Sequence, residues 1–590
     1  MENEKYIKPR MVPNPVTPCT AIIIDPDLCC GCNSCVNVCR IDVLLPRPSL
    51  PRPEEGVFPF KAPCESACPA GIDIRKQLAL ISEGRYEEAL QLIKRDTPLP
   101  SVCGRVCPRF CEMKCRRSPA DGAVAINMTK RFVADLDLNT GNPYVPAIKP
   151  QTGYSVAVVG SGPAGLSAAY YLALEGHSVS IFEGNPKLGG ILRYGVPDHR
   201  LSKEVLDKEI KTITDLCKDV QLNATFGRDI TIQSLKDKGF NAIFLGFGAQ
   251  KLLKLNVEGE DLTGVNHGVE FLKEINAGLK PDVGSTVVVI GGGMVAVDSA
   301  QSALRLGAAD VTMVALETRD KLPAYEEDLR LAIEEGVKVI PCYGVKKIIG
   351  EAGRVKAIEL KACTAVYDQN GAFNPQYDES KTFILKADDV VPAIGQVADL
   401  DPIEGSGVNV SAFIDVDETY QTSVPGVFAA GDIVTGAKTV IEAITAGHRA
   451  AEQIDSYLRG QQTVVRSNAA GEVITKDLTE FEKIDRAVMP TLTPEVRKHT
   501  FDEIELGLSE EAARKEAHRC LACGRPPVAV YSDECWFCGV CVKHCPIPGA
   551  IKMEYPLNQR VGWKRKETGE YFRVGMKNPP EPDTRPPVGK

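Results

Sequence analysis

Long apolar runs are missing from this sequence of 590 residues. None approaches the ~20 residues that a membrane-spanning helix needs, and residues 1–18 lack the apolar core of a secretion signal. Basic stretches are missing too, because the net charge of −9 is spread without long runs of one sign. We therefore expect a cytoplasmic protein that has no membrane span and binds no nucleic acid.

Cysteine, in contrast, is abundant and clustered. Of the 21 cysteines, six lie at 19–39, six at 64–115 and six at 520–545. In a cytosolic chain, clustered cysteines bind metal more often than they form disulfides. The length predicts several domains, since domains usually run to roughly 100–200 residues.

A Gly-rich turn, GSGPAG, follows the apolar β-rich run 155–159. A helix-like segment comes next, and then a second strand that ends at Glu183. In such a layout Gly160 makes the tight turn, Gly162 lets the backbone approach a pyrophosphate, and Gly165 lets the helix pack on the sheet. Glu183 would accept the ribose hydroxyls. The pattern predicts a dinucleotide-binding fold.

The same layout recurs further along the chain. The strand TVVVI is followed by GGGMVA, by a helix through about Leu306 and by a strand that ends at Glu317. The sequence therefore predicts two nucleotide sites. The dinucleotide folds contain no C-x-x-C pair, so a flavin bound there would have no dithiol partner and its electrons would leave by another route.

Three motifs carry a family resemblance: GSGPAG with LGGILRYGVPDHRL, then GGGMVAVDSA, then FAAGD. Over roughly residues 60–460 the chain resembles the flavoproteins with two dinucleotide-binding domains. More narrowly, it is similar to the glutamate synthase small subunit, the N-terminal half of dihydropyrimidine dehydrogenase and the large subunit of NADH-dependent ferredoxin:NADP oxidoreductase. The resemblance implies FAD at the first fold, a nicotinamide dinucleotide at the second, and the second domain inserted into the first.

The candidate FAD-binding residues are Gly160, Gly162, Pro163, Ala164, Gly165, Glu183, Gly190, Arg193, Gly431 and Asp432. The candidate NAD-binding residues are Gly291, Gly293, Met294, Ala296, Glu317 and Arg319. Relatives that use NADP carry Tyr-Arg-Arg after the second strand, where this chain reads Ala315-Leu316-Glu317. A carboxylate there favours a free 2′-hydroxyl and repels a phosphate. We expect NAD(H) rather than NADP(H), although Arg319 lies nearby.

The cysteines at 64–115 resemble the helical iron–sulfur domain of the same family, which holds two [4Fe–4S] clusters bound by thiolates. A zinc site is disfavoured by the spacing, mostly three residues, and by the lack of a nearby histidine. Relatives begin this domain with an R-C-x-x-C segment that is missing here, yet ARKEAHRCLACGRPP at 513–527 resembles it. One hypothesis is therefore a cluster held by Cys64, Cys115, Cys520 and Cys523. The alternative is that the last two cysteines belong to the C-terminal module.

The second cluster of this domain would use Cys68, Cys107 and Cys111. Its fourth ligand in dihydropyrimidine dehydrogenase is a glutamine, whose position is occupied here by Lys130, a poor ligand while it is protonated. We expect Cys103 to take its place.

Each end of the chain carries a ferredoxin-type quartet, C-x₂-C-x₂-C-x₃-C. The quartets are Cys29, Cys32, Cys35 and Cys39, and Cys535, Cys538, Cys541 and Cys545. In two-cluster ferredoxins the fourth cysteine binds the other cluster. One hypothesis is a split ferredoxin in which Cys545 completes the first cluster and Cys39 the second, within one chain or between two; separate single-cluster modules are the alternative. With the two clusters of the helical domain, this makes about four clusters.

The expected fold class is α/β, with an NAD domain inserted in an FAD domain, both Rossmann-like, a helical iron–sulfur domain, and ferredoxin-like α+β modules at the ends. The predicted divisions are 1–60 N-terminal ferredoxin-like segment, 61–150 helical iron–sulfur domain, 151–280 and 388–460 FAD domain, 281–387 NAD domain, 461–515 linker, 516–555 C-terminal ferredoxin-like module and 556–590 extended tail.

The expected activity is hydride transfer from NADH to FAD, followed by single-electron transfer through the clusters to or from a partner protein, either ferredoxin or another redox subunit. The cofactors supply this chemistry, so no catalytic acid or base is named. A homodimer or a hetero-oligomer is compatible with this function. The alternatives are an NADPH electron donor like the glutamate synthase small subunit, a flavin-based electron-bifurcating subunit, and an electron-relay scaffold without enzyme activity.

Overall fold

The computed structural model describes two long stretches of the chain, residues 62–461 and 484–521. It also gives the backbone of six short strands nearer the ends: β1 Ile22–Ile24, β2 Leu44–Pro46, β17 Val528–Val530, β18 Ile551–Met553, β19 Gly562–Lys564 and β20 Tyr571–Arg573. Nine predicted ligands lie outside the described residues: Cys29, Cys32, Cys35, Cys39, Cys523, Cys535, Cys538, Cys541 and Cys545. Among the helices in these stretches, none combines the length and the apolar character of a membrane span.

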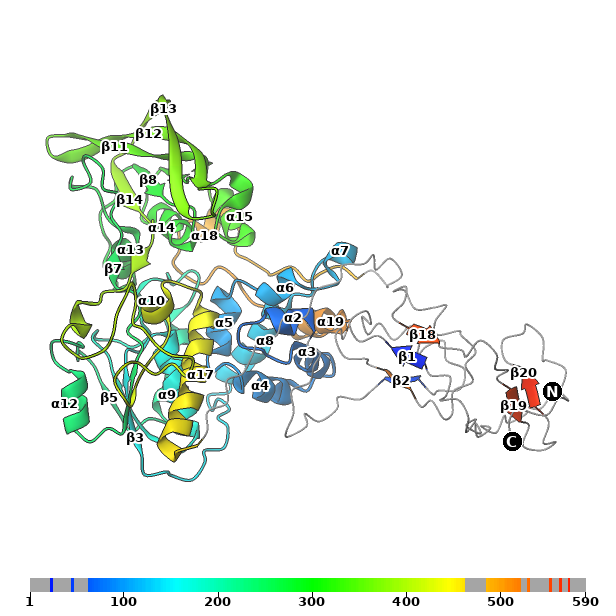
Figure 1. Cartoon of the computed structure of the whole chain (residues 1–590). Coiled ribbons are helices and arrows are strands. Elements are labelled where there is room, and N and C mark those ends of the chain that lie inside the picture. The colour runs from blue at the N-terminus through cyan, green and yellow to red at the C-terminus, as the bar shows by residue number, and fades with distance from the viewer. Residues whose placement is uncertain are drawn as a thin grey trace.

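Short helices form the first part of the described chain, as expected for the iron–sulfur domain (Figure 1). They are α2 Pro63–Ala67, α3 Ile74–Ser82, α4 Tyr86–Lys94, α5 Pro100–Val106, α6 Phe110–Met113, α7 Ser118–Asp121 and α8 Ile126–Leu138. Asp73 caps α3 by accepting a hydrogen bond from the backbone N–H of Lys76 at 3.2 Å. Gly104 lets α5 and α8 touch, because a Cβ at this position would lie 2.6 Å from the Cβ of Arg131.

The FAD domain contains a parallel sheet of five strands in the order β16-β6-β3-β4-β5. Its strands are β3 Ser155–Val159, β4 Ser178–Phe182, β5 Asp219–Gln221, β6 Ala242–Leu245 and β16 Val427–Ala429. Its helices are α9 Pro163–Leu174, α10 Ile191–Tyr194, α11 Lys203–Thr214, α12 Ile232–Asp237, α16 Asp432–Thr435 and α17 Val440–Arg459, with the 3₁₀ turn η2 Asp401–Ile403. Helix α9 is buried on nearly every side because it packs against both the sheet and α17.

The second predicted dinucleotide domain, which we call the NAD domain after that prediction, contains a second parallel sheet, in the order β10-β9-β8-β14. These strands are β8 Thr286–Ile290, β9 Asp310–Val314, β10 Lys338–Ile340 and β14 Asp389–Pro392, and the helices are α13 Gly268–Asn276, α14 Met294–Arg305 and α15 Glu326–Glu334, with the 3₁₀ turn η1 Arg319–Lys321. The sequence-based prediction ends this domain at residue 387, yet β14, at residues 389–392, pairs with β8 inside the sheet of this domain. A buried parallel strand reads as an uninterrupted apolar run, which does not show which of two sheets it joins.

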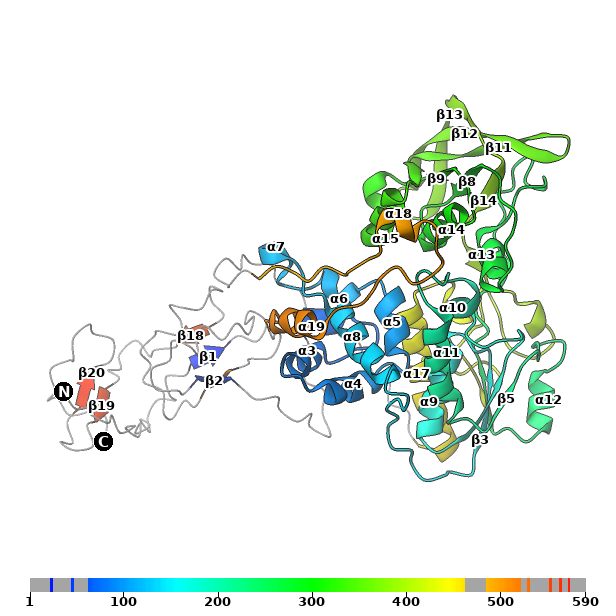
Figure 2. The same ribbon diagram turned by 180° about the vertical axis from the view of Figure 1, so that it is seen from behind.

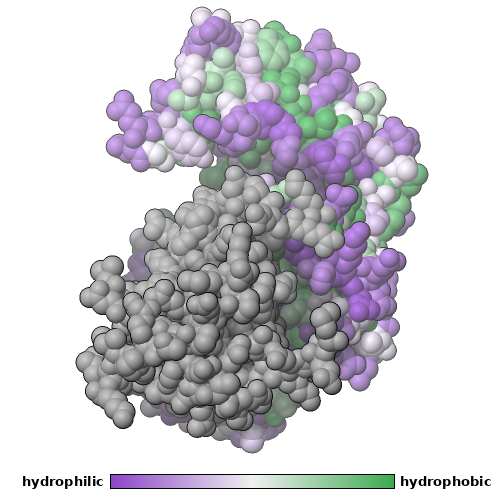
Figure 3. Space-filling view, turned by 90° about the vertical axis from the view of Figure 1, so that its right-hand side faces the viewer, coloured by the Kyte–Doolittle hydropathy of each residue, from purple (hydrophilic) through white to green (hydrophobic). Residues whose placement is uncertain are grey.

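The chain crosses between the two dinucleotide domains twice, at β7 Lys251–Leu252 and β15 Gln396–Val397, which pair antiparallel. This arrangement is that of one domain inserted into the other. The predicted α/β class with two Rossmann-like domains and a helical iron–sulfur domain is confirmed, whereas the predicted ferredoxin-like modules lie outside the two long described stretches. The NAD domain also carries an antiparallel sheet of β11 Tyr343–Glu351, β12 Arg354–Tyr367 and β13 Phe373–Lys386. Figure 3 shows polar and apolar side chains mixed on one face of this domain, at the top of the view.

Residues 484–508, which we call the strap, begin against the iron–sulfur helices, where Arg486 pairs with Glu112 at 2.6 Å. They reach the NAD domain at α18 Pro494–Arg497 and then return to the iron–sulfur helices (Figures 1 and 2). The strap leads into α19 Glu510–His518. Although α19 comes late in the chain, it packs against α3 and α8. The sequence predicts only a linker at 461–515, whereas Met489, Arg497 and Ile504 of the strap are buried.

Strands from the two ends of the chain pair with one another. Strand β1 is antiparallel to β18, and β2 is antiparallel to β17. In sequence, β1 and β2 flank the N-terminal cysteine quartet, while β17 and β18 flank the C-terminal one.

Candidate functional site

The first glycine turn leaves an open backbone at the N-terminus of α9. A Cβ on Gly160 would lie 2.6 Å from the carbonyl oxygen of Gly246, and a Cβ on Gly165 only 1.9 Å from that of Gly160. Gly162, in contrast, has no atom within 4 Å of its Cβ position. Two glycines are therefore required by close packing, whereas the third has open space beside it, where the predicted pyrophosphate would lie. Pro163 and Ala164 begin the helix behind this turn.

The Glu183 carboxylate lies at this turn and is buried. It accepts hydrogen bonds from the backbone N–H and the hydroxyl of Ser161, at 3.0 and 2.5 Å. Its other oxygen accepts from the backbone and side-chain nitrogens of Asn185, both at 2.8 Å. The carboxylate is thus held in place beside the turn, as the prediction that it meets a ribose requires.

Two further predicted FAD residues, Gly190 and Arg193, differ in the contacts that they make. Gly190 packs on the turn, because a Cβ there would lie 2.8 Å from the Cα of Gly162, and its φ of +52° is left-handed. Arg193 donates to the carbonyl of Leu188 at 2.9 Å and pairs with Asp207. Arg193 therefore supports the local fold here.

The segment after β16 reaches the same turn from the other side. A Cβ on Gly431 would lie 3.0 Å from the Cβ of Ala164, so the backbone of this segment approaches α9 closely. Burial raises the pKa of the neighbouring Asp432 carboxyl to about 6, although the backbone N–H of Lys438 donates to it at 3.2 Å. Residues far apart in sequence thus meet around one open backbone turn.

The second glycine turn repeats this geometry. A Cβ on Gly291 would lie 2.4 Å from the carbonyl oxygen of Ala393, and Gly293 has no atom within 4 Å of its Cβ position. Glu317 lies beside the turn, since its Oε2 would be 3.2 Å from a Cβ on Gly292. The carboxylate therefore reaches the place where a ribose would lie.

The neighbours of this turn include the remaining predicted NAD residues. The sulfur of Met294 accepts from the backbone N–H of Tyr325 at 3.4 Å, and Ala296 is buried in α14. Arg319 is partly exposed and pairs with Glu326 at 2.9 Å. The Arg319 guanidinium, which could otherwise bind a 2′-phosphate, thus already has a carboxylate partner.

Three of the four cysteines predicted for the first cluster line one cavity: Cys64, Cys115 and Cys520. Arg75, Lys114 and Arg116 line the same cavity. Burial raises the pKa of the Cys115 thiol. Cys520 lies there because α19 packs its buried Ala517 against the iron–sulfur helices. The next residue back, Arg519, is fully buried and donates to Glu516 at 2.7 Å and to Asp121 at 2.9 Å.

The other four cysteines of this domain act electrostatically on Lys130, which is buried. Burial lowers the pKa of its ammonium, but the electrostatic influence of Cys107, Cys103, Cys111 and Cys68 leaves that pKa raised. Burial also raises the pKa of the Cys103 thiol to about 12 and that of Cys111 well above its ordinary value. The donor set fits an iron–sulfur cluster, whose negative charge a nearby ammonium stabilises.

Within the described ranges, no three Cys, His, Asp or Glu side chains lie close enough to hold a single metal ion. A [4Fe–4S] cluster has a different requirement, because each cysteine binds a different iron atom.

Sequence reasoning missed two features of these sites. Gly246, which follows β6, meets Gly160 at the first turn, and the glycines of GFG at 246–248 were the available signal. Glu209 contacts the cysteine-bearing helix α5, and nothing in its sequence context marks it.

Comparison with known proteins assigns the chain to a class. Residues 154–451 match the pyridine nucleotide-disulphide oxidoreductase family, and residues 58–142 match the dihydropyrimidine dehydrogenase domain II, 4Fe-4S cluster family. The chain belongs to the first of these families and carries the iron–sulfur domain of the second. It is thus an enzyme, an NAD(P)H-dependent iron–sulfur flavoprotein oxidoreductase, and a scaffold without activity is no longer an alternative.

Several relatives are similar over most of the chain. The "NADP(+)-dependent formate dehydrogenase subunit beta" of Moorella thermoacetica is 38% identical over 80% of this chain and 72% of its own length. The "NADPH-Fe(3+) oxidoreductase subunit beta" of Geobacter sulfurreducens is 34% identical over 80% of this chain and 76% of its own. The "Glutamate synthase [NADPH] small chain" of Escherichia coli is 32% identical over 67% of this chain and 88% of its own. The predicted family resemblance is confirmed.

Proposed function

We propose that this chain carries electrons between NADH and a partner redox subunit, with FAD and iron–sulfur clusters as its cofactors. FAD, when bound, accepts a hydride from the nicotinamide and releases electrons singly. The observation that supports this most directly is that α5, which carries Cys103 and Cys107, shares one buried core with the FAD sheet and α9. The helix with these cysteines and the helix that follows the flavin turn therefore pack on one core, which brings the two sites together for electron transfer.

The preference for NADH rests on Glu317. Its carboxylate reaches the second glycine turn, where it would accept hydrogen bonds from the ribose hydroxyls and repel a 2′-phosphate. The relatives named above carry NADP or NADPH in their names, so this chain would differ from them at the adenosine end of the site.

Anaerobic mixing of the holoprotein with NADH or NADPH tests this preference. We expect NADH to bleach the flavin absorption at lower concentration than NADPH does. Faster reduction by NADPH would refute the assignment of NADH. Failure of both nucleotides to reduce the flavin would refute the proposed function itself.

About four [4Fe–4S] clusters per chain follow from the cysteine ligands proposed here. The cavity shared by Cys64, Cys115 and Cys520 supports a first cluster that Cys523 would complete. The group of Cys68, Cys103, Cys107 and Cys111, which acts electrostatically on Lys130, supports a second. The pairing of β1 with β18 and of β2 with β17 supports a split ferredoxin formed within one chain. Iron analysis of anaerobically purified protein is expected to give about 16 iron atoms per chain, whereas about eight would refute four clusters.

We further propose that the electrons pass to or from another redox subunit or ferredoxin. Similar chains are named as beta subunits or small chains, which supports a role as one part of a complex. Purification of the native complex, followed by identification of its other subunits, tests this. A chain that is isolated alone and reduces no protein acceptor would refute it.

A further inference from the structure

A buried carboxylate joins the FAD domain to the cysteine-bearing helix α5. Glu209 lies on α11 and is 2% exposed. Its two oxygens accept hydrogen bonds from the backbone N–H groups of Ser101 at 2.7 Å and Val102 at 2.8 Å. The contact links residues 107 and 108 positions apart in the sequence.

Helix α5 lacks a cap of its own. Its N-cap residue, Leu99, has no side-chain acceptor, and Pro100 has no N–H to donate. The first free N–H groups of the helix are therefore those of Ser101 and Val102. Glu209 accepts from both of them, so a residue of the FAD domain serves as the N-terminal cap of a helix in the iron–sulfur domain.

The two helices also share apolar packing. Val102, Cys103 and Val106 of α5 lie in the same core as Leu206 and Ile210 of α11. Cys103 directly follows Val102, whose backbone N–H donates to Glu209. Cys107 is the C-cap residue of the same helix.

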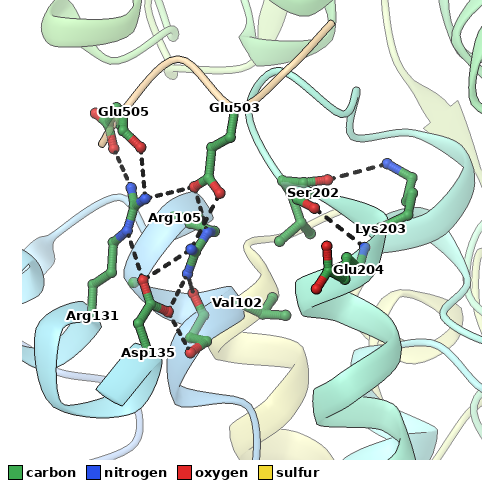
Figure 4. Close-up of polar contacts among 12 residues, drawn as sticks. Val102, Arg105, Arg131, Asp135, Ser202, Lys203, Glu204, Glu503 and Glu505 are labelled. Carbon is green, nitrogen blue, oxygen red and sulfur yellow. Dashed lines mark hydrogen bonds and ion pairs between the residues drawn. The ribbon is translucent and has the colours of Figure 1, made fainter. Parts of the chain in front are cut away.

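A second set of contacts to α5 comes from α8 and the strap. Asp135 accepts from the Ser101 hydroxyl at 2.8 Å and from Arg105 at 2.7 Å. Arg105 also pairs with Glu503 of the strap at 2.6 Å, and Glu503 in turn pairs with Arg131 (Figure 4). These contacts hold α5 against α8 and the strap, whereas Glu209 holds α5 against the FAD domain.

Helix α11 has an independent tie to the flavin turn. Asp207, two residues before Glu209, pairs with Arg193 of α10. Gly190, at the start of α10, packs directly on Gly162 of the glycine turn. A short chain of contacts therefore runs from the flavin turn through α10 and α11 to the first turn of α5.

We propose that Glu209 is a positioning residue that fixes the spacing between the flavin turn and the cysteines of α5, and thereby sets the rate of electron transfer between them. The inference rests on the proposed function, since it takes Cys103 and Cys107 as cluster ligands. Its physical basis is that electron transfer through protein slows steeply as the separation of donor and acceptor grows.

Three variants of the holoprotein test the proposal. Glu209→Gln retains the shape and one oxygen acceptor, while Glu209→Ala removes both acceptors. Glu204→Gln is the matched control, because Glu204 lies on the same helix but is 76% exposed and pairs only with Lys208 among the described residues. Rapid mixing with NADH separates two steps: bleaching of the flavin, and the later appearance of reduced clusters in frozen samples examined by electron paramagnetic resonance.

We expect flavin bleaching to keep its wild-type rate in all three variants. Cluster reduction is expected to slow by about tenfold to a hundredfold in the Glu209 variants and to remain unchanged in Glu204→Gln. Unchanged cluster reduction in Glu209 variants that hold full iron and FAD would overturn the proposal. Loss of iron from both Glu209 variants would also overturn it, since Glu209 would then retain a cluster rather than set a spacing. Wild-type protein whose flavin neither NADH nor NADPH bleaches would instead refute the proposed function.

Discussion

Removing the carboxylate of Glu335 is expected to release the strap from the NAD domain. Glu335 accepts from Arg305 of α14 at 2.7 Å and from Arg497 of the strap at 2.9 Å. The side-chain exposures of these three residues are 0%, 0% and 1%. Glu335→Gln would leave two buried guanidiniums without their shared countercharge.

The expected magnitude follows from this burial. Breaking a fully buried ion pair by removing one partner costs about 3–5 kcal/mol, because the remaining charge stays buried and uncompensated. Glu334 provides a matched control: it also pairs with Arg497, at 2.7 Å, but its side chain is 36% exposed. Losing such a partly solvated pair costs at most about 1 kcal/mol.

Amide hydrogen exchange across the strap measures the difference locally, without requiring reversible unfolding of the whole protein. A loss of about 3–5 kcal/mol corresponds to strap amides that exchange roughly 10²- to 10⁴-fold faster in Glu335→Gln. We expect a change of about fivefold or less in Glu334→Gln. Equal protection of the strap in the two variants would refute the view that the buried triad anchors it.

Three further predictions concern single residues. Glu317→Gln is expected to raise the KM for NADH about tenfold or more, since it removes a charged hydrogen bond; an unchanged KM would contradict the ribose contact. Cys520→Ser is expected to lower the iron content by about four atoms per chain, whereas Cys217→Ser, its control, leaves the content unchanged. Burial and two nearby guanidiniums hold the pKa of His199 well below 6.5. As the pH falls below about 6.5, this histidine is therefore protonated in the unfolded chain but stays neutral in the folded one. The free energy of unfolding therefore decreases by up to about 1.4 kcal/mol per pH unit in that range. His199→Gln is expected to flatten the pH dependence of the temperature at which flavin is released, and an unaltered slope would contradict this.

The glycine turns were predictable because their requirements are local. Strand, turn, helix and strand follow one another within about 30 residues, so the sequence alone shows which glycine must be small and which must be open. The position of Cys520 was a reasonable hypothesis because its flanking residues resemble a segment missing elsewhere. Its approach to Cys64 and Cys115 could not be derived from spacing, since it depends on the packing of α19.

The strap and Glu209 could not be predicted, for a different reason. Many of their contacts are polar and join residues that are far apart in the chain, as between Arg497 and Glu335 or Glu209 and Ser101. Hydrophobic periodicity carries no signal for such contacts. A polar segment between two domains is indistinguishable by composition from a solvated linker until its partners are known.

The return of α19 to the iron–sulfur helices has a consequence for biosynthesis. Cys64 and Cys115 leave the ribosome early, whereas Cys520, which lines the same cavity, follows Cys115 by about 400 residues. At ~5–20 residues per second, that interval lasts roughly 20–80 s. The cavity is therefore completed only after both dinucleotide domains have been synthesised. A cluster that needs Cys520 as a ligand is inserted late in the synthesis of the chain or after it.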